Sequence, residues 1–171
     1  NLTARRTSVC RMAAAAHCDV MPVDMGIAGA PVPGAADCRI AAGTADFTTG
    51  PAMTRAQAVQ AIAAGIALVR AQKQSGAQLL ATGEMGIGNT TTSSAVASVL
   101  LGRPVAEMTG RGAGLSDAGL QRKIDAIERG IARNHPDAAD PLGVLAALGG
   151  FDIAGLCGVF LGGALERLPI V

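Results

Sequence analysis

The sequence contains no tryptophan and no tyrosine, and only three phenylalanines among its 171 residues. Aromatic side chains supply the stacking surfaces on which single-stranded nucleic acids are commonly held, so binding of that kind is not expected. The hydrophobic core must be built from alanine, leucine, valine, isoleucine and methionine. Together with 23 glycines, this composition indicates closely packed helices on a sheet, with glycine where backbones approach one another.

Charged residues are also scarce. Lysine and arginine number 14 against 13 acidic residues, which leaves a formal net charge of +1. A chain so nearly neutral, and without a basic run, has no field that would attract nucleic acid or an anionic membrane. The most apolar late segment, residues 153–165, is too short to span a bilayer, and no signal peptide is recognisable. We therefore expect neither a nucleic-acid partner nor a membrane partner.

Metal-binding and disulfide patterns are missing as well. The four cysteines form no C-x-x-C pair, and only two histidines could add imidazole ligands. Neither a zinc site nor a disulfide scaffold is expected, and no cofactor is predicted. The cysteines are interpreted as buried or partly buried thiols in a reducing compartment, which favours a cytoplasmic location.

Hydrophobic periodicity predicts helices alternating with strands. Helices are expected over residues 2–16, 54–74, 91–101, 116–134, 140–148 and 152–168, and strands over residues 20–23, 38–41, 77–82 and 168–171. This alternation predicts an α/β fold with a mostly parallel, Rossmann-like, three-layer sheet that has helices on both faces. The start at Asn1 and the end in the apolar run LPIV suggest a piece of a longer protein. Residues 1–171 are thus expected to form a single domain that is incomplete at both ends.

The segment GEMGIGNTT, residues 83–91, is predicted to link a strand to a helix. It has no lysine where a P-loop needs one, and Thr91 stands where a dinucleotide-binding loop needs its third glycine. Glycines and a helix N-terminus still favour an anion such as a phosphate or carboxylate. The alternative interpretation is a tight turn with an ordinary Asn/Thr cap. Glu84 is unexpected in an anion-binding loop, and is either a site carboxylate or an ordinary surface glutamate.

Other candidates lie in later and earlier segments. RGAG, residues 111–114, could form a second backbone nest, and Lys123 on the following helix flanks the packed face. Lys123 could equally cover the core with its stem. Asp24 follows a predicted strand and could be a site residue, although capping its own turn is an alternative. His135 is interpreted as structural.

Several segments together resemble one family, nicotinate-nucleotide–dimethylbenzimidazole phosphoribosyltransferase. GEMGIGNTT is similar to the family signature. VDMGIAG (residues 23–29), GTADFTTGPAMT (residues 43–54), GRGAG (residues 110–114), Lys123 and DPLGVLAALGGFDIAG (residues 140–155) resemble family segments in the same order. The resemblance extends over essentially the whole chain. It identifies residues 1–171 as the central part of the family's large α/β domain, without its N-terminal and C-terminal segments.

The resemblance implies a transferase with two small-molecule substrates. Nicotinate mononucleotide and 5,6-dimethylbenzimidazole would give α-ribazole 5′-phosphate and nicotinate, in the assembly of the cobalamin lower ligand. It also implies a homodimer for the full-length protein, and no metal. Glu84 would be a supporting carboxylate that stabilises the developing positive charge at the ribose. The phosphate and ribose would be bound by Gly83, Met85, Gly86, Ile87, Gly88, Asn89, Thr90, Thr91, Arg111, Gly112, Ala113, Gly114 and Lys123.

The chain departs from the family pattern in two places. Family members commonly have threonine where Ala113 stands. Their principal catalytic glutamate lies in a C-terminal RLGEGTGA-type segment that these residues do not contain. Two alternatives therefore stay open at this point: an inactive nucleotide-phosphate-binding module, and a truncated relic that mainly dimerises or misfolds.

Overall fold

The computed structural model describes all residues 1–171, and they form two compact units, Asn1–Gly43 and Thr44–Val171. The first unit contains helix α1 (Ser8–Ala15) and strands β1 (Val23–Asp24) and β2 (Ala36–Asp37). The second contains helices α2 (Arg55–Gln74), α3 (Asn89–Leu101), α4 (Val105–Met108), α5 (Asp117–Asn134), α6 (Pro141–Leu148) and α7 (Phe151–Glu166). No helix is both long and apolar enough to cross a membrane.

The elements of the first unit are shorter than the sequence predicts. Residues 2–5 form a separate turn, and Arg5 takes a left-handed conformation (φ 53°) that prevents one continuous helix. Strands β1 and β2 pair in parallel, with Val23 opposite Ala36 and Asp24 opposite Asp37. The strands expected over residues 20–23 and 38–41 are therefore displaced toward residues 23–24 and 36–37.

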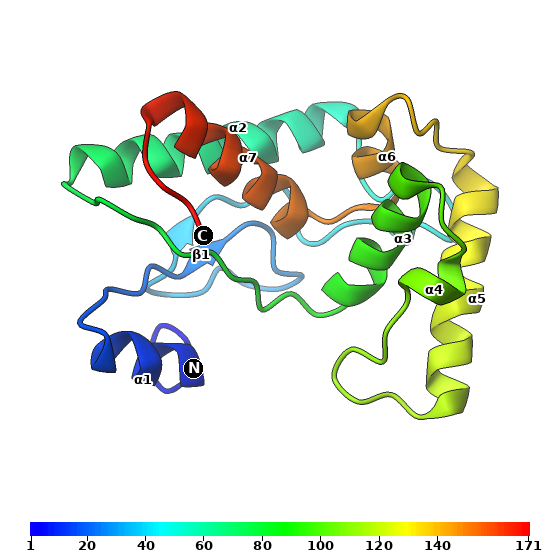
Figure 1. Ribbon diagram of the computed structural model, residues 1–171, viewed down its shortest axis with the longest axis horizontal. Coiled ribbons are helices and arrows are strands. Elements are labelled where there is room, and N and C mark those ends of the chain that lie inside the picture. The colour runs from blue at the N-terminus through cyan, green and yellow to red at the C-terminus, as the bar shows by residue number, and fades with distance from the viewer. The chain divides into compact units, whose positions relative to one another are not determined.

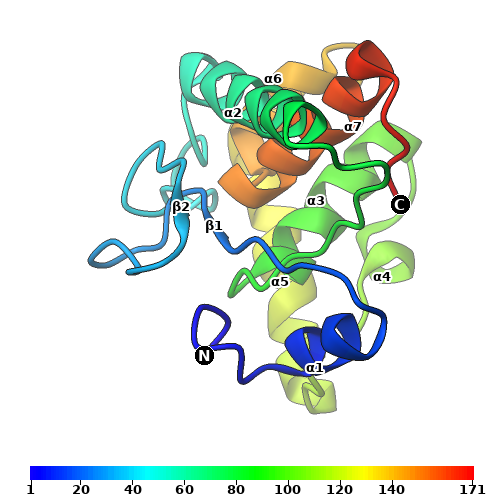
Figure 2. The same ribbon diagram turned by 90° about the vertical axis from the view of Figure 1, so that its left-hand side faces the viewer.

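Close backbone contact joins α2 and α7, which lie side by side in both views of the molecule (Figures 1 and 2). A Cβ atom on Gly65 would overlap the carbonyl oxygen of Gly155, and one on Gly158 would overlap the carbonyl oxygen of Ile62. Glycine on both helices thus lets the two backbones approach more closely than larger residues would allow. The expected helix over residues 152–168 ends at Glu166, because Arg167 takes a left-handed conformation (φ 51°).

A second core lies among α3, α5, α6 and the segment before α2. It consists of Phe47, Ala52, Ala95, Ile127, Ala147 and Leu148, with Val96, Val99, Val105 and Ile131 packed against it. Leu100, which the periodicity assigns to the inner face of α3, is 39% exposed. Ser94, Ala95 and Ser98 are buried there instead, since the close packing of α3 admits only small side chains.

Parallel pairing is limited in extent. Residues 77–82 and 168–171 meet as a single parallel bridge between Leu80 and Ile170. Hydrogen bonds from Leu80 N–H to the Pro169 carbonyl (3.0 Å) and from Val171 N–H to the Leu80 carbonyl (2.9 Å) support it. The structure is thus a mixed α/β arrangement of seven helices with one two-stranded parallel sheet.

Candidate functional site

The glycine-rich loop leads directly into the N-terminus of α3. Gly88 is the N-cap and has a left-handed backbone (φ 90°), so glycine is favoured there. Helix α3 begins at Asn89, two residues before the expected start at Thr91. The N–H groups of a first helical turn lack intrahelical partners, and that of Thr90 donates to no protein acceptor. This helix end therefore presents donors and a partial positive charge.

The loop itself is open to solvent. All residues from Gly83 to Gly88 are exposed, Met85 at 67% and Ile87 fully. A Cβ atom on Gly83 or Gly88 would meet no atom within 4 Å. Thr91 N–H donates to the Gly88 carbonyl at 2.9 Å and is therefore occupied within the turn.

The second glycine cluster forms a turn before α5. Gly112 (φ 56°) and Gly114 (φ 99°) both have left-handed backbones. The N–H of Gly114 donates to the Arg111 carbonyl at 3.2 Å, within the turn. The Arg111 side chain folds back onto the start of α5, where it donates to the Leu115 carbonyl at 2.9 Å and pairs with Asp117. Ala113 is exposed.

Lys123 links the two glycine clusters. Its ammonium donates to the Thr90 hydroxyl at 2.9 Å and to the Gly110 carbonyl at 3.0 Å. Gly112 completes the group, because a Cβ atom there would lie 2.8 Å from the Thr90 Oγ1 and 3.6 Å from the Lys123 Nζ. The structure therefore brings Thr90 of α3, Gly112 of the turn before α5 and Lys123 of α5 together.

The charge of Lys123 is not balanced within the protein. The residue is only 8% exposed, both of its acceptors are neutral, and none of the ion pairs includes it. Burial lowers the pKa of the Lys123 ammonium, since an apolar environment disfavours its charged form. An ammonium has three donors and two are used here, so one remains for a ligand. Thr90 is exposed, which gives an anion access to this group.

Glu84 has a different partner. Its Oε2 atom accepts a hydrogen bond from the Gly86 N–H at 2.7 Å, so that N–H is not directed at a ligand. A second carboxylate lies beside the same glycine: a Cβ atom on Gly86 would overlap the Oδ2 atom of Asp152 and lie 3.5 Å from the Glu84 Oε2. From the sequence, Asp152 is expected only as the start of a helix. The signal that could have identified it is its place after Gly149 and Gly150, in the first turn of α7.

Asp24 belongs to the first unit and caps its own turn. It is 2% exposed, and its carboxylate accepts from the N–H groups of Gly26 and Ile27, each at 2.9 Å. Arg39 donates to the other oxygen at 3.1 Å. Burial acts to raise the pKa of Asp24, but the hydrogen bonds from Ile27, Gly26 and Arg39 outweigh it, and the pKa is lowered. The carboxylate is fully engaged, as the alternative structural interpretation predicts.

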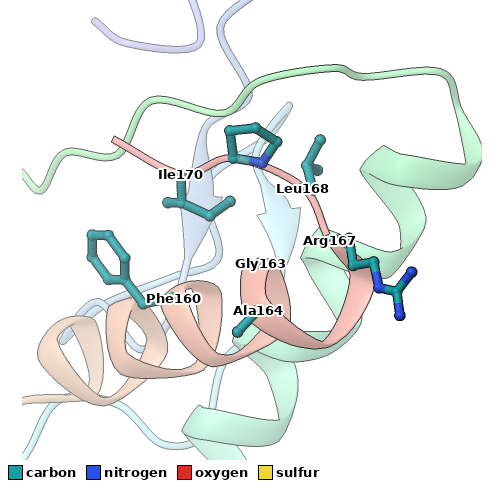
Figure 3. A pocket seen from close by; sticks show the side chains of 7 residues that line it. Phe160, Gly163, Ala164, Arg167, Leu168 and Ile170 are labelled. Carbon is teal, nitrogen blue, oxygen red and sulfur yellow. The ribbon is translucent and has the colours of Figure 1, made fainter.

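Other features lie outside the Thr90–Lys123 group. His135 ends α5 in a left-handed conformation (φ 45°), which is a structural role. No group of three or more His, Cys, Asp or Glu side chains could hold a metal ion. A shallow hollow of about 350 Å³ lies at the C-terminal end of α7, where Figure 3 shows Phe160 and Ile170 beside it. It contains none of the candidate residues.

Comparisons with known proteins agree on one family. A family model described as phosphoribosyltransferase matches residues 1–171. A nicotinate-nucleotide–dimethylbenzimidazole phosphoribosyltransferase from Roseiflexus castenholzii is 56% identical over 155 residues, covering 89% of this chain and 44% of the relative. The protein of that name from Ruminiclostridium cellulolyticum is 51% identical over 154 residues, covering 90% and 44%.

Solved structures extend the agreement to the fold. The crystal structure of CobT from Thermus thermophilus superposes with a TM-score of 0.92 at 39% sequence identity, covering 99% of this chain and 51% of that one. The family model and the shared fold thus place the protein among the phosphoribosyltransferases. The chain belongs to the family of nicotinate-nucleotide–dimethylbenzimidazole phosphoribosyltransferases, as the sequence motifs predict, and spans about half the length of the relatives it matches.

Proposed function

We propose that this chain binds the phosphoribosyl group of nicotinate mononucleotide, and that the protein containing it transfers this group to 5,6-dimethylbenzimidazole. The products are α-ribazole 5′-phosphate and nicotinate. One observation carries the proposal: Lys123 is a buried cation without a counter-ion, and it joins the segment GEMGIGNTT, through Thr90, to the segment GRGAG, through Gly110. A dianionic phosphate supplies the missing charge and accepts hydrogen bonds from several directions.

In this proposal the 5′-phosphate lies against the Lys123 ammonium, the Thr90 hydroxyl and the N-terminus of α3. The backbones of residues 83–91 and 111–114 shape the rest of the phosphate and ribose site. Lysine suits the task because it acts as a compact point charge. Neutral backbone donors add affinity without needing counter-charges of their own.

The transfer itself is a displacement at the anomeric carbon. A benzimidazole nitrogen forms a bond to C1′ while the bond from C1′ to the nicotinate nitrogen breaks, and its electron pair leaves with nicotinate. Attack from the opposite face turns the β-nucleotide into an α-nucleotide. Glu84 stabilises the positive charge that develops on the ribose. The second benzimidazole nitrogen gives up its proton to a base, which the family motif assigns to a glutamate outside residues 1–171.

Four further features are part of the proposal for the full-length protein. Both units belong to one large domain, of which this chain is the central part. The short parallel pairings at β1–β2 and at Leu80–Ile170 belong to a larger three-layer sheet. The protein acts as a homodimer. It works in the cytoplasm, which the four free cysteines support because disulfides are rare there.

The test measures binding and turnover separately. Calorimetry with nicotinate mononucleotide should show saturable binding to the 171-residue chain, weakened at least tenfold in Lys123→Met, because a charge-assisted contact is lost. The matched control is Lys73→Met, which removes an exposed lysine in the last turn of α2. Equal affinity of the two variants would contradict the proposed phosphate site.

Turnover is assayed in the full-length protein with both substrates. Formation of α-ribazole 5′-phosphate, detected by mass spectrometry, is the expected result, and Glu84→Gln should slow it more than it weakens nucleotide binding. Nucleotide binding without any product would instead favour an inactive binding module.

A further inference from the structure

Asp152 is partly buried, and its carboxylate lies between Gly86 of the glycine-rich loop and Gly150 at the start of α7. A Cβ atom on Gly86 would overlap its Oδ2 atom, and a Cβ atom on Gly150 would overlap its Oδ1 atom. Neither glycine has a left-handed backbone, so conformation alone does not require glycine at either place. The space taken by this carboxylate is the physical reason for glycine on both sides.

The carboxylate is held by directed hydrogen bonds. Its Oδ2 atom accepts from the side-chain amide of Asn89 at 2.8 Å, and its Oδ1 atom accepts from the Ile153 N–H at 2.9 Å. The Asn89 amide oxygen in turn accepts from the Ser93 hydroxyl at 3.0 Å. A chain of hydrogen bonds therefore connects the first turn of α7 with the first residue of α3.

The signature loop, residues 83–88, forms no hydrogen bonds with distant parts of the protein. Residues 83–88 are all exposed. The hydrogen bonds that hold it are local ones, from Gly86 N–H to Glu84 at 2.7 Å and from Asn89 N–H to the Gly86 carbonyl at 3.3 Å. Asp152 is the point at which α7 meets this loop.

We propose that Asp152 is a positioning residue for nucleotide binding: through Asn89 and Gly86 it fixes the signature loop and the N-terminus of α3 in the conformation that receives the phosphoribosyl group. The inference rests on the proposed function. Without the Asp152–Asn89 hydrogen bond, the signature loop samples more conformations. Nucleotide binding must then order the loop, and the entropy lost in doing so lowers the affinity. The charged acceptor makes this hydrogen bond stronger than a neutral one.

A double-mutant cycle tests the proposal on the 171-residue chain with nicotinate mononucleotide as the probe. Asp152→Ala should weaken binding about tenfold to a hundredfold, the range for loss of a hydrogen bond to a charged group. Gly86→Ala should weaken it by a similar factor, because the new methyl group displaces Asp152. In the Asp152→Ala background, however, Gly86→Ala should cost less than about twofold, since the atom it overlaps is gone.

Three controls separate positioning from a general loss of structure. Asp125→Ala removes an exposed carboxylate on α5 that accepts a hydrogen bond from Gln121, and this variant should bind the nucleotide like the wild type. Asp152→Asn keeps the shape and one acceptor oxygen, and it should recover part of the lost affinity. Thermal unfolding should show that each variant is still folded at the temperature of the binding measurement, so that the loss of affinity is not a loss of fold.

The outcomes distinguish this inference from the proposed function. If the wild-type chain does not bind the nucleotide, the proposed function fails. If it binds and Lys123→Met does not, but the effects of Gly86→Ala and Asp152→Ala simply add, the proposed function stands and the positioning role of Asp152 is overturned. In the full-length enzyme, the expected result for Asp152→Ala is a raised KM for the nucleotide with a smaller change in kcat.

Discussion

The ammonium of Lys123 and the hydroxyl of Thr90 meet at 2.9 Å, although 33 residues separate them in the chain. This contact ties the middle of α5 to the first turn of α3 and places a buried cation at a helix N-terminus. Two positive features placed together are unfavourable until an anion joins them. The contact is therefore the basis of the proposed anion site, and its two partners can be tested separately.

Replacing Thr90 tests the hydroxyl. Thr90→Val keeps the side-chain shape but removes the acceptor of Lys123 and a donor to the phosphate, so affinity for nicotinate mononucleotide should fall about tenfold. Thr90→Ser retains the hydroxyl and should stay within about threefold of the wild type. Calorimetry on the three proteins makes the comparison. Equal affinities for the valine and serine variants would remove Thr90 from the site.

The buried charge of Lys123 predicts a pH dependence of stability. Its pKa is lowered in the folded protein relative to the ordinary value of 10.5. Below the lowered pKa the unfolded chain gains more from protonation, so the charge destabilises the fold throughout that range. Stability should rise as pH increases from the lowered pKa toward 10.5. Urea unfolding at a series of alkaline pH values measures this rise.

The control for this rise in stability at alkaline pH is Lys123→Met, whose free energy of unfolding should not increase in the same way because it has no ammonium at this position. Saturating nicotinate mononucleotide should also reduce the rise in the wild type, because a bound phosphate favours the charged form of Lys123. An identical pH profile in the wild type and the variant would show that the ammonium is not destabilised by burial.

The sequence predicted those parts of the structure that depend on local signals. Thr54, Ser116 and Asp140, where three of the helices are expected to begin, cap α2, α5 and α6, since their side chains accept from N–H groups only three residues away. The strands were harder to place. Their ends depend on pairing partners distant in the chain, such as Ile170 for Leu80, and apolar residues alone do not fix those ends.

The site residues likewise divide into those that the sequence indicates and those that only tertiary packing reveals. The place of Lys123 beside the apolar face of a predicted helix, together with the family motif, predicts it as a site residue, but its hydrogen bonds to Thr90 and Gly110 follow from tertiary packing. Asp152 was missed because an aspartate in a first helical turn is also an ordinary favourable choice. Its significance depends on Gly86 and Gly150, and only the folded structure places all three together.

The α2–α7 contact predicts that alanine is harmful at Gly158. In an isolated helix, alanine in place of glycine stabilises by about 1 kcal/mol. Here the new Cβ atom overlaps the Ile62 carbonyl oxygen, a backbone atom that cannot turn aside. We expect Gly158→Ala to lower the free energy of unfolding by about 2 kcal/mol, within the usual range for overpacking. Urea unfolding measures it.

Gly50→Ala is the control for Gly158→Ala, because a Cβ atom at Gly50 meets no atom within 4 Å and its backbone is not left-handed. Its free energy of unfolding should change by less than about 0.5 kcal/mol. A Gly158→Ala variant as stable as the wild type would mean that α2 and α7 separate without cost.

Asp24 predicts a dependence on acid pH in the first unit. Its folded pKa lies below the ordinary value of 3.8, so its contribution to stability is complete above 3.8 and is lost as pH falls through the lowered pKa. Asp24→Ala should cost about 3 kcal/mol at pH 7, because it removes the charged partner of the largely buried Arg39 and frees two backbone N–H groups. Denaturant unfolding at pH 7 and at acid pH measures both effects.

The control for Asp24→Ala is Asp19→Ala, which removes an exposed carboxylate and should change the free energy of unfolding by less than about 0.5 kcal/mol. If Asp24→Ala and Asp19→Ala proved equally stable at pH 7, the turn at residues 24–27 would not depend on the buried carboxylate.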